Sequence, residues 1–173
     1  MPEDTVFIFT AKSIETLLEE GGTSRWRLDR NHVRQCTYAV CTRNAHASWT
    51  EGPEPHHSAF LIGKIKDVVP AHYDEDEDAE NLEGRFLIEF SEYARVDIPN
   101  AWRGGRYPIR YANLADLAID PSTLHWEAMP ARADAERAPP VRDTSIGALA
   151  EAKRIICQGL NVSPEAVEIT IRA

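Results

Sequence analysis

The sequence predicts an α+β fold: a small, strongly bent mixed β-sheet or partly open β-barrel with two or three short helices and a C-terminal helix–strand appendage. Residues 85–98 alternate between apolar and polar side chains, which is the pattern of a half-buried strand. Gly63 lies inside another predicted strand, 59–69, where a glycine marks a bulge or a sharp bend. A helix follows the first strand. Short strands, an early helix and an internal glycine favour closure over a flat sheet.

The predicted strand 85–98 is the segment around which the chain is organised. Apolar side chains occupy its even-numbered positions from Phe86 to Ile98, with Glu92 as the exception. We therefore expect this strand to cover a core on one side only. Five consecutive acidic residues at 74–78 separate it from the strand 59–69, and such a run predicts a solvated loop.

The first 45 residues predict a strand, a helix and a second strand. Residues 5–10 are apolar and β-rich, which suits a central position in a sheet. Ser13 is a typical N-cap for a helix that ends at Gly21 and Gly22. Residues 37–44 are rich in β-forming side chains.

The second half of the chain predicts a domain end, a linker and a tail. Prolines and glycines predict irregular structure at 99–111, followed by a short helix at 114–118 and an edge strand at 124–129. We therefore expect a domain over residues 1–130 and a linker over 131–143. The helix–strand tail, 144–173, is too small to bury its own core, so we expect it to dock on the domain or on a partner.

Composition narrows the class of protein. A formal net charge of −9 argues against non-specific binding to duplex DNA or to an anionic membrane. No apolar run approaches the ~18 residues of a membrane span. The three cysteines form no CxxC pair, and the histidines lack metal-ligand spacing. We expect a cytoplasmic protein with reduced thiols, no metal and no cofactor.

Two segments combine aromatic and arginine side chains. Residues 102–111 contain three arginines and no acid, and a second cluster lies at 25–30. Aromatic rings can stack on bases, while guanidinium groups bind phosphate or base edges. The alternative is that the aromatic residues close the end of a barrel and the arginines pair with the acidic loop. The predicted ligand-binding residues are Trp26, Arg27, Trp102, Arg103, Arg106, Tyr107, Arg110 and Tyr111.

The order of elements resembles the PUA-like barrels, specifically ASCH- and EVE-type domains. The matching parts are residues 6–9, 14–20, 22–28, 38–42 and 60–69. The resemblance implies a small β-barrel with a helix after its first strand and a cleft that accepts RNA or a modified base. The ASCH pattern Gly-x-Lys-x-x-Glu-x-Arg is incomplete here. Ser24 lies near the lysine position and residues 22–28 contain no glutamate, which counts against ASCH-type hydrolysis.

These observations predict a non-enzymatic binding module for a nucleotide, a modified base or a single-stranded nucleic acid. One alternative is a small hydrolase that uses Glu92 or Glu89 as a base with a raised pKa. Another is a protein-interaction subunit or homodimer in which residues 144–173 complete a partner's sheet.

Overall fold

The computed structural model describes residues 2–72, 83–131, 155 and 157. The chain divides into two units, Met1–Arg132 and Ala133–Ala173. Most of the predicted linker and tail lies outside the described residues, as does the acidic run at 74–78. The domain boundaries and the docking of the tail therefore stay predictions.

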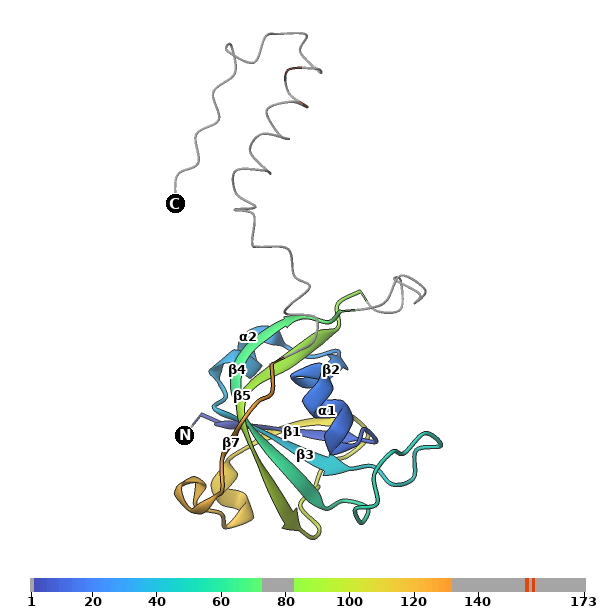
Figure 1. Ribbon diagram of the computed structural model, residues 1–173, viewed down its shortest axis with the longest axis vertical. Helices are drawn as coiled ribbons and strands as arrows, with labels where there is room; N and C mark the ends of the chain where they lie inside the picture. The colour runs from blue at the N-terminus through green and yellow to red at the C-terminus, as the bar shows by residue number, and fades with distance from the viewer. Residues whose placement is uncertain (1, 73–82, 132–154, 156, 158–173) are drawn as a thin grey trace. The chain divides into compact units, whose positions relative to one another are not determined.

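The first unit is a strongly curled half-barrel sheet with two short α-helices among its described residues (Figure 1). The strands are β1 (Thr5–Thr10), β2 (Gly22–Trp26), β3 (Tyr38–Arg43), β4 (Ala59–Pro70), β5 (Phe86–Ile98), β6 (Ile109–Ala112) and β7 (Glu127–Ala128). The helices are α1 (Ile14–Glu20) and α2 (Arg30–Gln35), with 3-10 turns at Leu114–Leu117 and Pro121–Thr123. The α+β class with a bent sheet is confirmed, whereas membership of the PUA-like barrels stays a prediction.

The sheet is mixed. Its strand order is β2-β5-β4-β3-β1-β6, and β7 pairs with β5. β1 and β3 run parallel, while every other pairing among the described strands is antiparallel. β1 therefore lies between two strands, in the interior position that its apolar sequence predicts.

Local signals explain where α1 begins and ends. The Ser13 side chain accepts a hydrogen bond from the backbone N–H of Thr16, which caps the helix N-terminus. Gly21 ends α1 in the left-handed conformation, with φ of 76°. The predicted cap and stop are both confirmed.

Three elements were not predicted from the sequence: β2, α2 and β6. Residues 109–112 are not irregular, because they pair with β1 along the edge of the sheet. The six residues of α2 are too few to show a helical apolar pattern in the sequence. The helix is nevertheless capped by the Asp29 side chain, which accepts hydrogen bonds from two backbone N–H groups. Only Val33 of α2 is buried.

The expectation that β5 covers a core on one side only is wrong. Ser91 is an extra residue in β5, opposite no partner in β4, and this bulge moves the following side chains to the other face. Ile88 and Phe90 therefore pack in one cluster of buried residues, whereas Val96 and Ile98 pack against another.

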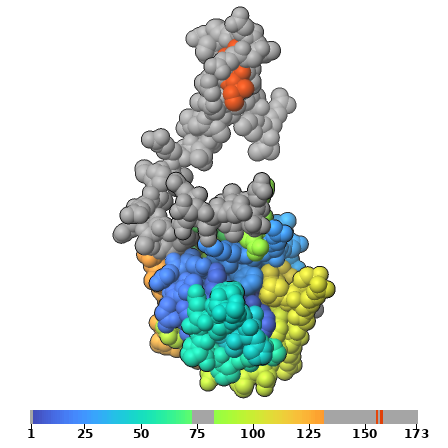
Figure 2. All heavy atoms as spheres, turned by 90° about the vertical axis from the view of Figure 1, so that its right-hand side faces the viewer, coloured from blue at the N-terminus to red at the C-terminus, as the bar shows by residue number. Residues whose placement is uncertain are grey.

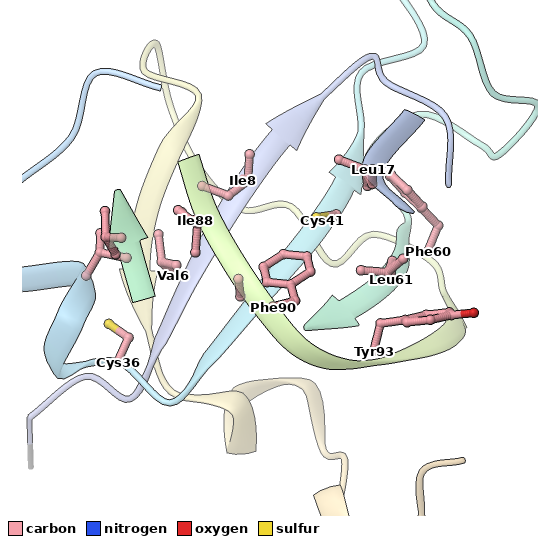
Figure 3. Packing of buried hydrophobic residues seen from close by; sticks show 13 residues of the cluster. Val6, Ile8, Leu17, Cys36, Cys41, Phe60, Leu61, Ile88, Phe90 and Tyr93 are labelled. Carbon is pink, nitrogen blue, oxygen red and sulfur yellow. The ribbon is translucent and has the colours of Figure 1, made fainter. Parts of the chain in front are cut away.

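Two apolar clusters lie on opposite faces of β1. The first cluster lies between the sheet and the two helices (Figure 3), and the second is covered by residues 101–126. The first contains Val6, Ile8, Leu17, Val33, Cys36, Ala39, Cys41, Phe60, Leu61, Val68, Ile88, Phe90 and Tyr93. The second contains Phe7, Val40, Ala59, Ile62, Ala101, Trp102, Ala112 and Leu114.

The glycine predicted to bend its strand is required for packing. A Cβ atom at Gly63 would lie 2.5 Å from ring atoms of Phe90, which is itself buried in the first cluster. Gly63→Ala should therefore lower the free energy of unfolding by about 1–3 kcal/mol, the usual cost of overpacking a core. Gly105→Ala is the matched control, since a Cβ there meets no atom within 4 Å. Equal urea midpoints for the two variants would contradict this account.

Candidate functional site

The arginine loop, residues 99–108, carries exposed positive charge. Arg103 and Arg106 are exposed, and Tyr107 between β5 and β6 is 76% exposed. Neither guanidinium forms an ion pair with any residue that the structure describes. Arg110 follows on β6, where its guanidinium lies 5.8 Å from the centre of the Phe7 ring. The loop thus presents two cations and one aromatic ring to solvent.

The histidine loop, residues 44–58, holds three imidazole rings in a row. The ring centroids of His46 and His56 lie 3.7 Å apart in a stacked arrangement, and those of His56 and His57 lie 4.0 Å apart. The backbone N–H of Ala45 donates to Nδ1 of His56 at 3.1 Å. This hydrogen bond lies next to the two backbone bonds that close the base of the loop, in which Arg43 donates to Ser58 and His57 donates to Arg43.

Phe9 joins the two loops. Its ring stacks on Trp102 with a centroid distance of 4.9 Å, and it lies 5.3 Å from His56 and 5.4 Å from His57. The Phe9 N–H donates to the carbonyl of Pro108, and the Trp102 N–H donates to the carbonyl of His57. Figure 2 shows the histidine loop in teal on the same face as the yellow residues around the arginine loop and β6. We call the surface that the histidine loop, residues 44–58, and the arginine loop, residues 99–108, form on this face the loop surface.

An ion pair between a buried arginine and a partly buried glutamate anchors the histidine loop. The side chain of Arg43 is fully buried, and its Nε and Nη2 donate to Oε2 of Glu54 at 2.9 and 2.6 Å. Its Nη1 donates to the carbonyl of Lys12 at 2.6 Å, and its guanidinium lies 4.1 Å from the centre of the Phe60 ring. The guanidinium of Arg43 therefore stabilises the fold and is not accessible to a ligand, in contrast to the exposed guanidinium groups of the arginine loop.

A second carboxylate ties the loop to the start of α1. Glu51 accepts hydrogen bonds from the Ser13 N–H at 2.8 Å and from the Thr16 hydroxyl at 2.7 Å. These bonds hold the pKa of Glu51 below its usual value. The bond from the Ser13 backbone N–H contributes most, and the bond from the Thr16 hydroxyl contributes next. The anchor therefore persists to a lower pH than it would for a glutamate without these bonds.

The predicted site residues are not all brought together. Trp102 is only 6% exposed and packs in the second cluster, whereas Trp26 packs against the first and donates its Nε1–H to Thr23. The two indoles therefore lie on different faces of the sheet. Arg27 is exposed beside Trp26. Its ligand-binding role stays a prediction.

Tyr111 is also occupied by internal packing. Its ring stacks on His32 with centroids 3.8 Å apart, and it packs against the first cluster. Burial raises the pKa of Tyr111 to about 12. Of the predicted residues, Arg103, Arg106 and Tyr107 are thus the members of the loop surface that face solvent most openly.

Sequence reasoning missed Phe9 and the three histidines as parts of this surface. The histidines were considered only as candidate metal ligands, for which their spacing is unsuitable. Their association depends on how the loop closes, and the sequence signal for it is limited to the adjacent pair His56 and His57.

The carboxylates named for the hydrolase alternative are not buried bases. Oε2 of Glu92 lies 2.7 Å from Nζ of Lys64, and its side chain is 41% exposed. Glu89 is half-buried in β5. The bulge at Ser91 explains why the Glu92 side chain is partly exposed, because it turns that side chain away from the first cluster.

Thiol and metal chemistry also find no support in the described part of the chain. Burial raises the pKa of Cys36 to about 11 and that of Cys41 to about 12, so both thiols are protonated at neutral pH. No three described side chains are grouped to hold a metal ion. None of the described helices is both long enough and apolar enough to cross a membrane.

The anchoring role of Glu54 predicts a large cost for its neutralisation. Glu54→Gln leaves the buried guanidinium of Arg43 without its counter-charge, so the free energy of unfolding should fall by about 3 kcal/mol. Glu92→Gln is the matched control, because it neutralises a partly exposed ion pair and should cost under about 1 kcal/mol. Chemical denaturation of both variants measures the difference. Similar losses of stability would show that Arg43 does not depend on Glu54.

Comparison of the chain with protein-family models, with curated proteins and with solved structures found no match. The resemblance to PUA-like barrels is therefore neither confirmed nor contradicted, and the loop surface is the basis for a functional proposal.

Proposed function

We propose that the protein is a binding module for a nucleotide or a single-stranded nucleic acid, which it contacts through the loop surface. The observation that carries this proposal is the exposure of Arg103 and Arg106 without an ion pair in the described part of the chain. The chain as a whole has a net charge of −9. Cations that stay exposed on so acidic a chain are available to an anionic ligand.

The chemistry of the loop matches a phosphate joined to a base. A guanidinium group can donate two parallel hydrogen bonds to phosphate oxygens, which fixes the orientation of the ligand. Tyr107 adds an exposed ring on which a base can stack. Bases in a duplex are stacked on one another and offer no free face, so this combination favours a single strand or a mononucleotide.

The buried aromatic residues have a supporting role in this proposal. Trp102 and Phe9 stack on each other and fix the ends of the arginine loop and the histidine loop. Gly104 permits this packing, because a Cβ atom there would lie 2.2 Å from the Trp102 indole. The arginine loop is thus held at Trp102 and Gly104 and is exposed at Arg106 and Tyr107.

Arg106→Ala should weaken binding of a fluorescein-labelled single-stranded oligonucleotide. For each phosphate that the variant no longer neutralises, the slope of log K against log salt concentration should become shallower by about 0.7. Fluorescence anisotropy between about 50 and 200 mM salt measures both quantities. Arg95→Ala is the matched control, since Arg95 is an exposed arginine on β5, outside both loops. A competing mononucleotide distinguishes recognition of one nucleotide from recognition of a strand. Absence of oligonucleotide and mononucleotide binding at low salt would refute the proposal.

Tyr107 offers a separate test of base stacking. Tyr107→Ala should cost about 1–3 kcal/mol of binding free energy, the usual value for one stacked base. Tyr107→Phe keeps the ring and should bind as the unchanged protein does. Equal affinities of the Ala and Phe variants would mean that the loop binds phosphate alone.

A further inference from the structure

We propose that the histidine loop is a pH-sensitive strap. The bond from Ala45 to His56 holds while the imidazoles are neutral and is released when His56 takes up a proton, whereas the backbone bonds between Arg43 and residues 57 and 58 persist. The inference does not rest on the proposed function, because it concerns the internal bonds of the loop and not its ligand. It rests on one hydrogen bond, on the ring stack and on the charges around them.

The hydrogen bond between Ala45 and His56 requires a neutral ring. The Ala45 N–H donates to Nδ1 of His56, and a ring nitrogen accepts a hydrogen bond only when it carries no proton. Protonation at Nδ1 places two donors against each other. The hydrogen bond between Ala45 and His56 then breaks. The backbone bonds from Arg43 to Ser58 and from His57 to Arg43 contain no titratable group and remain.

The ring stack opposes the same protonation. His56 lies between His46 and His57, at centroid distances of 3.7 and 4.0 Å, so a charge on one ring repels a charge on the next. Phe9 lies against His56 and His57 and adds an apolar neighbour that cannot solvate a cation. In agreement with this geometry, the pKa of His56 is lowered. Burial is the largest cause, followed by the charges of His57 and His46.

The other charged groups around the loop do not offset this repulsion. Those on the loop and on the elements packed against it are Glu51, Glu54, Arg43, Lys12, Glu15, Glu19, Glu20, Arg103, Arg106 and Arg110, of which Glu15 and Glu19 are exposed on α1. Arg43 is paired with Glu54, and Lys12 with Glu20. Glu51 is held by hydrogen bonds at the start of α1. The arginine loop, which meets the strap at Trp102, adds only positive charge.

The direction of the effect follows from proton linkage. The open loop binds a proton at the ordinary pKa of histidine, about 6.5, whereas the closed loop binds it at a lower pKa. The closed state is therefore fully favoured above that value, and its advantage falls as the pH drops through the window below it. Glu51 keeps its charge through this window, because its pKa is lowered from an already acidic value. The strap thus loosens at the bond between Ala45 and His56, while its backbone bonds and its acidic anchors persist.

The experiment uses the full chain labelled with ¹⁵N and follows amide exchange, corrected for the intrinsic effect of pH, from about pH 7.5 to about pH 5.5. The protection of the Ala45 amide should fall several-fold at the acidic end, while core amides such as Val40 keep theirs. His56→Gln should remove this pH dependence. His46→Gln should move the transition to higher pH, since it removes a neighbouring charge that lowers the pKa of His56.

His125→Gln is the matched control, because His125 is exposed and stacks on none of the three rings. It should leave the transition unchanged. Constant protection of Ala45 across the range would overturn the proposal, as would a simultaneous fall at Val40, which would indicate global unfolding. Retention of the transition in His56→Gln would also overturn it. Oligonucleotide affinity enters none of these outcomes, so a failure here is distinct from a failure of the proposed function.

Discussion

The arrangement of the loop surface depends on burial of β1 on both faces. Side chains alternate along this strand, so Val6 and Ile8 enter the first cluster while Phe7 and Phe9 face the second. β3 and β6 flank β1 and fix its register. Phe9 therefore has a fixed position near the end of an interior strand. Two loops without regular structure can use its ring as a common support.

Each loop is held at its ends and exposed in its middle. The histidine loop is fixed by the buried Arg43 and by the bond between the His57 carbonyl and the Trp102 N–H. The arginine loop is fixed by that same bond and by the carbonyl of Pro108, which accepts from Phe9. Exposed loop residues on a rigid scaffold are where binding groups are commonly found, because the scaffold fixes their position without burying them.

The sequence predicted the elements whose signals are local. Ser13 and Gly21 delimit α1 by hydrogen bonding and by a left-handed φ, and both can be read without knowledge of any neighbour. The bulge at Ser91 has no such signal, because it exists only as a mismatch between β5 and β4. The alternation along β5 therefore predicted a strand correctly, whereas the expectation that its apolar side chains share one face was wrong.

The candidate site divides in the same way into residues with a local signal and residues without one. Composition alone predicted Arg106 and Tyr107 as candidates, since a run of arginine and aromatic residues without acids is visible in the sequence. The separation of the two indoles was not visible, because each packs with residues far from it along the chain.

The two loops share one support, and this sharing constrains how they can influence each other. The described contacts between them run through the Phe9 ring and through the bond from Trp102 to His57. If release of the bond between Ala45 and His56 loosens the arginine loop through this route, a ligand that orders the arginine loop must disfavour proton uptake by the same free energy. Coupling through these contacts therefore has a fixed direction. Positive charge gained by the histidines acts in the opposite direction, because it attracts phosphate through space.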